Sequence, residues 1–129
     1  MKSILIIDDE EAVRSALKRV LERAGYVVRL AASGPEGLEA LKTQPVDVVI
    51  TDIVMPKVHG VDTIKAIAQA FPLVRIVAIS GGGNFGINEY KPNAITTTAY
   101  LTAAQAAGAH AVLTKPFETR DVLQAINGG

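Results

Sequence analysis

Residues 46–60, VDVVITDIVMPKVHG, decide the fold that the remainder of the chain completes. Residues 47–51, which are β-branched after Asp47, predict a short buried strand, and the carboxylate of Asp52 comes at its C-terminal end. Pro56 restricts the backbone of the loop that follows, and Gly60 restores conformational freedom at the end of that loop. Ligands of open α/β sheets bind in the crevice at the carboxyl ends of the strands, so we expect Asp52 to lie in a functional site.

Hydrophobic periodicity on both sides of this segment alternates between strand and helix patterns. Further strands are predicted at residues 4–7, 26–30, 74–79 and 111–114. Ser33 and Glu36 form a capping box that begins one of the helices. Four helices are predicted from apolar residues at helical spacing, namely Val13, Leu17, Val20 and Leu21, then Leu38 and Leu41, then Ile64, Ile67 and Phe71, and finally Val122, Leu123 and Ile126. Another helix is predicted at residues 95–107. In the first helix, charged residues that include Arg14 and Arg19 fall on the other faces.

A strand that alternates regularly with a helix predicts a parallel sheet covered on both sides, since the crossovers are right-handed. Five such units are too few for a closed eight-stranded barrel. The remaining choice is an open doubly wound sheet, and its favoured small version, the flavodoxin-like type, has strand order 2-1-3-4-5. The ligand crevice of that arrangement lies at the switch point between strands 1 and 3.

The composition describes one ordinary globular domain, which we expect to span residues 1–129. Apolar residues make up 49% of the chain, and 13 basic residues balance 13 acidic ones. Neither a nucleic-acid partner nor a membrane surface is therefore expected. The absence of cysteine excludes disulfides and thiolate metal sites. The short apolar run at the N-terminus is too brief for a signal peptide, so we expect a cytoplasmic protein.

Chemistry-bearing residues fall at the ends of four predicted strands. Strand 1 ends at Asp8 and Asp9, strand 3 at Asp52, strand 4 at Ser80 and strand 5 at Lys115. The three carboxylates converge at the switch point and repel one another there, which a hard divalent cation such as Mg²⁺ relieves. A carboxylate nucleophile, a metal, a hydroxyl and a lysine are the groups that stabilise a transferring phosphoryl group.

The sequence resembles the receiver domains of two-component response regulators, the CheY-like superfamily, over nearly its whole length. The motifs that carry the resemblance are IIDDE at residues 6–10, TDIVMP at 51–56, ISG at 79–81 and KPF at 115–117. The resemblance implies a signalling switch that catalyses its own phosphorylation and dephosphorylation and has no metabolic substrate. Its partners would be a sensor histidine kinase or a histidine phosphotransfer protein, and a downstream protein target.

The resemblance also implies a role for each motif residue. Asp52 would accept the phosphoryl group, and Ser80 and Lys115 would each hold one of its oxygens. Asp9, Asp52 and the carbonyl of Val54 would bind Mg²⁺ (or Mn²⁺) directly, with Asp8 acting through water. A cis bond before Pro116 would aim Lys115. Val54 and Gly82 lie two residues past Asp52 and Ser80, at positions where side chains control the access of water, and would affect the lifetime of the phosphoryl group.

Three features depart from the family pattern. His59 replaces the usual aspartate before Gly60, and we expect it to be solvent-exposed. Val112 stands where relatives carry a Tyr or Phe that swings inward on phosphorylation, so this aromatic switch cannot operate here. The segment between Ser80 and Lys115 is longer than usual, which predicts an extended region after strand 4. Its low charge suggests either a covered core helix or a docking surface, for example for a homodimer through residues 84–112.

Two other functions compete with the phosphoacceptor switch. A phosphorylation-independent scaffold of the same fold is favoured by Val112 and by the long segment after Ser80. An enzyme, a phosphatase that uses an aspartyl phosphate, would need an Asp-x-Asp motif after strand 1, and Asp8-Asp9-Glu10 does not supply it. The intact set of Asp8, Asp9, Asp52, Ser80 and Lys115 favours the switch.

Overall fold

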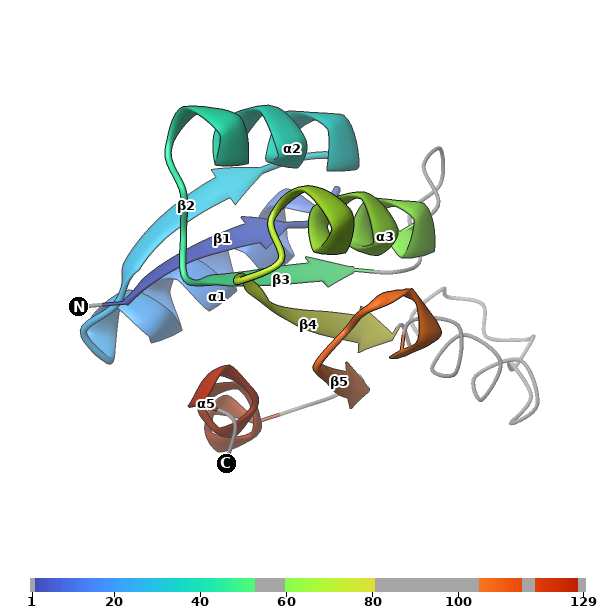
Figure 1. The fold of residues 1–129 in the computed structure, drawn as a ribbon. Helices are drawn as coiled ribbons and strands as arrows, with labels where there is room; N and C mark the ends of the chain where they lie inside the picture. The colour runs from blue at the N-terminus through green and yellow to red at the C-terminus, as the bar shows by residue number, and fades with distance from the viewer. Residues whose placement is uncertain (1, 53–59, 81–104, 115–117, 128–129) are drawn as a thin grey trace, which may run out of the picture.

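A five-stranded parallel sheet forms the centre of the molecule, with strand order β2-β1-β3-β4-β5 (Figure 1). The computed structural model describes residues 2–52, 60–80, 105–114 and 118–127. The strands are β1 (Ser3–Ile7), β2 (Val27–Ala31), β3 (Val48–Asp52), β4 (Arg75–Ser80) and β5 (Ala111–Thr114). The helices with defined bounds are α1 (Glu11–Arg23), α2 (Gly34–Thr43), α3 (Gly60–Ala70) and α5 (Thr119–Asn127). The predicted fold class and strand order are therefore confirmed.

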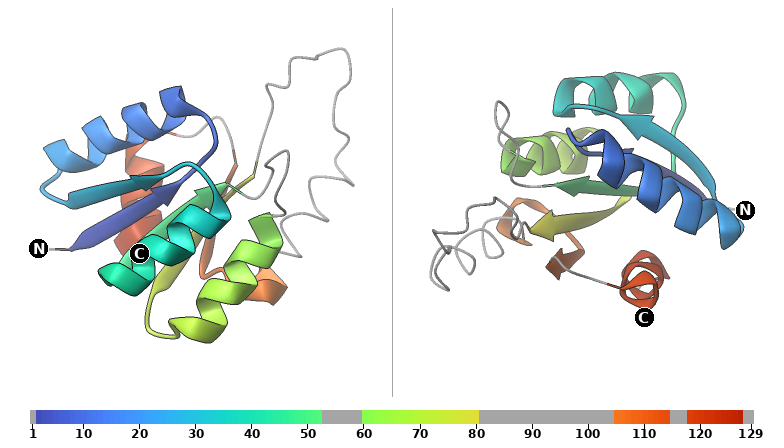
Figure 2. Two further views of the ribbon diagram at one scale, coloured as in Figure 1. Left: turned by 90° about the horizontal axis from the view of Figure 1, so that it is seen from above. Right: turned by 180° about the vertical axis from the view of Figure 1, so that it is seen from behind.

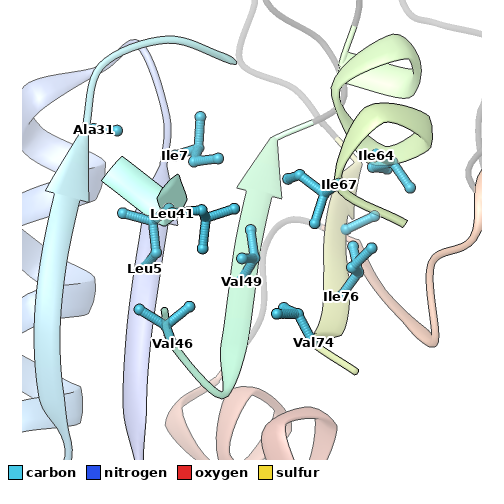
Figure 3. Packing of buried hydrophobic residues seen from close by; sticks show 11 residues of the cluster. Leu5, Ile7, Ala31, Leu41, Val46, Val49, Ile64, Ile67, Val74 and Ile76 are labelled. Atoms are coloured by element: carbon cyan, nitrogen blue, oxygen red, sulfur yellow. The ribbon is translucent and has the colours of Figure 1, made fainter. Parts of the chain in front are cut away.

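The helices with defined bounds lie on both faces of the sheet (Figures 1 and 2). Helices α2 and α3 lie on one face, over a cluster that includes Leu5, Val49 and Ile76 (Figure 3). Helices α1 and α5 lie on the other face, over a cluster that includes Ile4, Ile50 and Val77. Adjacent strand residues thus enter opposite layers, and β1 and β3 are buried on both sides.

Local signals in the sequence agree with the observed helix ends. Ser33 is the N-cap of α2, and its side chain accepts a hydrogen bond from the Glu36 N–H. The Glu36 carboxylate in turn accepts from the Ala32 N–H at 2.9 Å, one residue before the cap. Gly25 and Gly108 have φ values of +99° and +127°, a left-handed conformation that glycine adopts without strain.

Most of the predicted helix 95–107 and the extended region after β4 lie outside the described residues. Residues 105–107 are helical. The strand predicted at 47–51 lies one residue further on, so that Asp52 is the last residue of β3. In the described part of the chain, no helix has both the length and the apolar character needed to cross a membrane.

Candidate functional site

Three carboxylates meet at the C-terminal ends of β1 and β3. Asp8, Asp9 and Asp52 each present one carboxylate oxygen, and these oxygens all lie within 4.8 Å of one another. Asp8 and Asp52 are buried, with 1% and 4% of their surfaces exposed, whereas Asp9 is exposed. Two carboxylates of the site are therefore buried, and the third is accessible to solvent.

Asp52 owes its place to the central strand of the sheet. Strand β3 runs between β1 and β4, and Asp52 pairs in register with Ile79 of β4. The preceding residues alternate between the two apolar layers, with Val49 in one and Ile50 in the other. Their complete burial anchors the strand and fixes the position of the carboxylate at its end.

Asp8 is held where β1 gives way to α1. Its backbone N–H donates to the Ala31 carbonyl at 3.1 Å, which extends the β1–β2 pairing by one residue. Its carboxylate oxygen Oδ1 accepts a hydrogen bond from the Glu10 N–H at 2.8 Å. Its carbonyl accepts a hydrogen bond from the Arg14 guanidinium at 2.7 Å. Asp8 is thus fixed through both its backbone groups and its side chain.

Of the other predicted phosphoryl-binding residues, Ser80 is the one that the described part of the chain includes. Ser80 is the last residue of β4 and pairs in register with Thr114, the last residue of β5. The backbone of Ser80 is therefore at the same edge of the sheet as Asp52. Lys115 directly follows β5 in the sequence. The predicted residues Val54, His59, Gly82, Lys115 and Pro116 all lie outside the described residues.

Val112 is half-buried in β5, where it pairs with Ala78 and packs against the layer beneath α2 and α3. The side chain at this position is therefore aliphatic and packed against the core. Of the two histidines, His110 has a structural role. It makes two hydrogen bonds with the backbone of Ile76. The backbone N–H of His110 donates to the Ile76 carbonyl at 2.8 Å, and the ring nitrogen Nδ1 of His110 accepts from the Ile76 N–H at 3.0 Å.

The donor set fits a small, hard divalent cation. All three clustered side chains offer carboxylate oxygen, the ligand type that Mg²⁺ takes together with waters and phosphate oxygens. Three negative charges within 4.8 Å repel one another, and two of them are buried. A bound cation would compensate both the repulsion and the loss of solvation.

The position of the Arg14 side chain was not predicted from the sequence, because helical periodicity placed this residue among the charged residues on the outer faces of α1. The structure instead finds it half-buried, with its guanidinium on the Asp8 carbonyl. A signal was present, since Arg14 lies in the first helical turns after the acidic pair and four residues after Glu10, whose carbonyl accepts the Arg14 N–H. Periodicity assigns a face of a helix and not the direction of a long side chain.

Comparison with known proteins agrees with this geometry. The family model of the response regulator receiver domain matches residues 4–127. The chain is 34% identical over 127 residues to the chemotaxis protein CheY of Thermotoga maritima, covering 98% of this chain and 95% of that protein. It matches the crystal structure of a response regulator receiver domain protein from Clostridium thermocellum with a TM-score of 0.83 and 32% identity, covering 99% of this chain and 93% of that one.

A further similar structure contains a modified aspartate. It is a response regulator protein from Burkholderia pseudomallei, described with a phosphorylated aspartic acid, a calcium ion and citrate. The TM-score is 0.81 at 27% sequence identity, and the match covers 98% of this chain and 66% of that one.

Proposed function

The chain belongs to the response regulator receiver domain family, and on this premise we propose that it is a Mg²⁺-dependent phosphoacceptor switch in which Asp52 is the nucleophile. The family implies phosphoacceptor signalling in two-component systems. The roles proposed for Mg²⁺ and for Asp52 rest on the cluster of Asp8, Asp9 and Asp52, with Asp52 at the end of the central strand. Residues 1–129 would form one such domain.

The transfer step is a substitution at phosphorus. A carboxylate oxygen of Asp52 attacks the phosphorus of a phosphohistidine on the partner protein, an O–P bond forms, and the N–P bond to the imidazole breaks. The imidazole nitrogen leaves with the electron pair of that bond. Attack by water on the aspartyl phosphate then releases inorganic phosphate and restores the Asp52 carboxylate, which resets the switch.

The remaining residues of the proposed site position and neutralise charge. Asp9, Asp52 and the Val54 carbonyl would hold Mg²⁺ (or Mn²⁺), with Asp8 acting through water. The cation would offset the negative charge on the phosphoryl oxygens. Ser80 would donate a hydrogen bond to one of these oxygens, and Lys115, aimed by Pro116, would pair with another. Val54 and Gly82 would affect how readily water reaches the aspartyl phosphate.

The proposed partners are a sensor histidine kinase or a histidine phosphotransfer protein, and a downstream protein target in the cytoplasm. Since Val112 cannot act as an aromatic switch, Ser80 and the loops beyond the strands would transmit the phosphorylated state. A homodimer through residues 84–112 is one form that the output would take, and most of that segment lies outside the described residues.

Intact-mass measurement with a small phosphodonor tests the proposal. After incubation with Mg²⁺ and acetyl phosphate, the wild type should gain one phosphoryl group, whereas Asp52→Asn should gain none. Chelation of the cation with EDTA should abolish the adduct. Asp47→Asn is a matched control, because Asp47 lies just before the opposite end of β3 and bonds to Ser3.

An adduct that persists in Asp52→Asn would move the phosphorylation site to another residue. If the wild type forms no adduct with acetyl phosphate or with a phosphorylated histidine phosphotransfer protein, the phosphoacceptor proposal fails. The phosphorylation-independent scaffold would then be the better description of the protein.

A further inference from the structure

We propose that Arg14 is a positioning residue for the metal site, because it fixes the peptide unit that joins Asp8 to Asp9. This inference rests on the proposed function, in which these two aspartates serve the cation. Arg14 itself does not contact the cation or the phosphoryl group in the proposal. Its role is to set the orientation of two of the three carboxylates through one backbone hydrogen bond.

The geometry of the β1–α1 junction carries the proposal. Nη1 of Arg14 donates to the carbonyl oxygen of Asp8 at 2.7 Å, the short distance typical of a charge-assisted hydrogen bond. That carbonyl belongs to the peptide unit between Asp8 and Asp9. On the other side, the N–H of Asp8 is held by Ala31. Rotation of the Asp8–Asp9 peptide would therefore break the Arg14 bond, while leaving the strand pairing in place.

Asp9 is the residue that most needs such a restraint. Asp8 and Asp52 are buried, so their surroundings limit the movement of their side chains, but Asp9 is exposed. The direction in which Asp9 presents its carboxylate follows from the peptide plane that precedes it. The bond from Arg14 thus pre-organises Asp9 through its backbone, in the way that outer-shell groups orient metal ligands.

Arg14 is itself well supported. The backbone N–H of Arg14 donates to the Glu10 carbonyl at 3.1 Å in the first turn of α1. The helix is anchored to the sheet by Leu17 and Leu21, which are buried. A half-buried guanidinium on a rigid helix loses less freedom on forming this bond than an arginine on a loop would. Through Arg14, the position of the Asp8–Asp9 peptide therefore depends on a helix that is packed against the core.

The positive charge of Arg14 has an effect opposite in sign to its positioning role. A cation near the acidic cluster repels Mg²⁺, so removal of the charge alone should tighten Mg²⁺ binding. Removal of the hydrogen bond should weaken it, because the carboxylates lose their arrangement. The sign of the change in Mg²⁺ affinity therefore separates the two roles.

Titration calorimetry with Mg²⁺ alone measures this sign. We expect Arg14→Ala to bind Mg²⁺ about ten- to a hundredfold more weakly than the wild type, the usual range when an outer-shell partner of a metal site is lost. Arg14→Lys keeps the charge and one donor, and should recover part of the loss. Arg19→Ala is the matched control, since it removes an exposed charge from the same helix and should not weaken binding.

Amide hydrogen exchange of the Mg²⁺-free protein gives a second measurement. The Glu10 N–H donates to Oδ1 of Asp8, and we expect it to exchange faster in Arg14→Ala while the β1 amides stay protected. Retained β1 protection also shows that the variant is folded.

Equal or tighter Mg²⁺ binding by Arg14→Ala, or unchanged Glu10 exchange, would overturn the positioning role. If Arg14→Ala does not fold, the same two measurements on Arg14→Lys decide, since a weaker donor should give smaller shifts in the same direction. If the wild type itself does not bind Mg²⁺, the proposed metal site is wrong, and the exchange of Glu10 still decides what Arg14 does.

Discussion

At the scale of single residues, Gly34 is required by a neighbouring side chain. It is the first residue of α2 and is buried against Thr63 of α3. A Cβ atom at position 34 would overlap the Thr63 hydroxyl oxygen and lie 3.4 Å from the Thr63 Cβ. Thr63 is only 4% exposed, so it has little room to move away. The close packing of α2 on α3 depends on this missing methyl group.

We therefore expect Gly34→Ala to lower the free energy of unfolding by about 1–3 kcal/mol, the usual cost of overpacking a well-packed site. Thr63→Ala removes the hydroxyl that the new methyl group meets. In the double variant the loss should be smaller than the sum of the two single losses. Urea denaturation of all four proteins measures the coupling, and strictly additive losses would show that the overlap is relieved elsewhere.

At the scale of elements, the start of α2 is stabilised by two reciprocal side-chain bonds. Ser33 accepts from the Glu36 N–H, and Glu36 accepts from the Ala32 N–H. Pro35 lies in the first turn, where its missing N–H costs no hydrogen bond. The negative charge of Glu36 also lies at the positive end of the helix. These features define where the β2–α2 loop ends.

Ser33→Ala should cost about 1 kcal/mol of unfolding free energy, because an N–H at the helix start loses its partner. Ser33→Asp should keep most of the stability, since its carboxylate accepts the same bond and interacts favourably with the helix dipole. Thr43→Ala, at the far end of α2, is the control for a general loss of a side-chain bond. Thermal unfolding of the three variants measures these differences. A Ser33→Asp variant as unstable as Ser33→Ala would contradict the predicted role of the cap.

At the scale of the whole molecule, two apolar layers hold a sheet whose one edge carries concentrated negative charge. The layers supply the stability, and the acidic cluster opposes it through repulsion and burial of charge. Folding and cation binding are therefore linked, because only the folded chain brings the three carboxylates together.

Mg²⁺ should raise the free energy of unfolding of the wild type by mass action, by about 2.7 kcal/mol at a hundred times the dissociation constant. Asp8→Asn should be more stable than the wild type without Mg²⁺, since one buried charge of the cluster is removed, and should gain less when Mg²⁺ is added. Urea denaturation with and without Mg²⁺ gives both differences. A variant that is less stable without Mg²⁺ would show that Asp8 contributes more through its hydrogen bonds than it costs through its charge.

Much of the fold was predictable from local signals. The apolar run before Asp52 has the length of one buried strand, and the capping box at Ser33 gave the start of α2 correctly. The strand boundaries followed less directly from the sequence, because they are set by backbone pairing, which includes polar as well as apolar residues, as Asp52 paired with Ile79 shows. For this reason Asp52 proved to be inside β3 and not just after it.

The sequence by itself determined the fold class and the chemical character of the site, and the strand order followed from the favoured small form of that fold. Alternating strand and helix periods allow only a parallel doubly wound sheet at this length, and such a sheet brings its strand ends to one edge. Only the tertiary structure decided that Asp8 and Asp52 are buried while Asp9 is exposed, and that Arg14 turns back onto the Asp8 carbonyl. Those features depend on how α1 packs against the sheet, and contacts between distant residues set them rather than the period of any one segment.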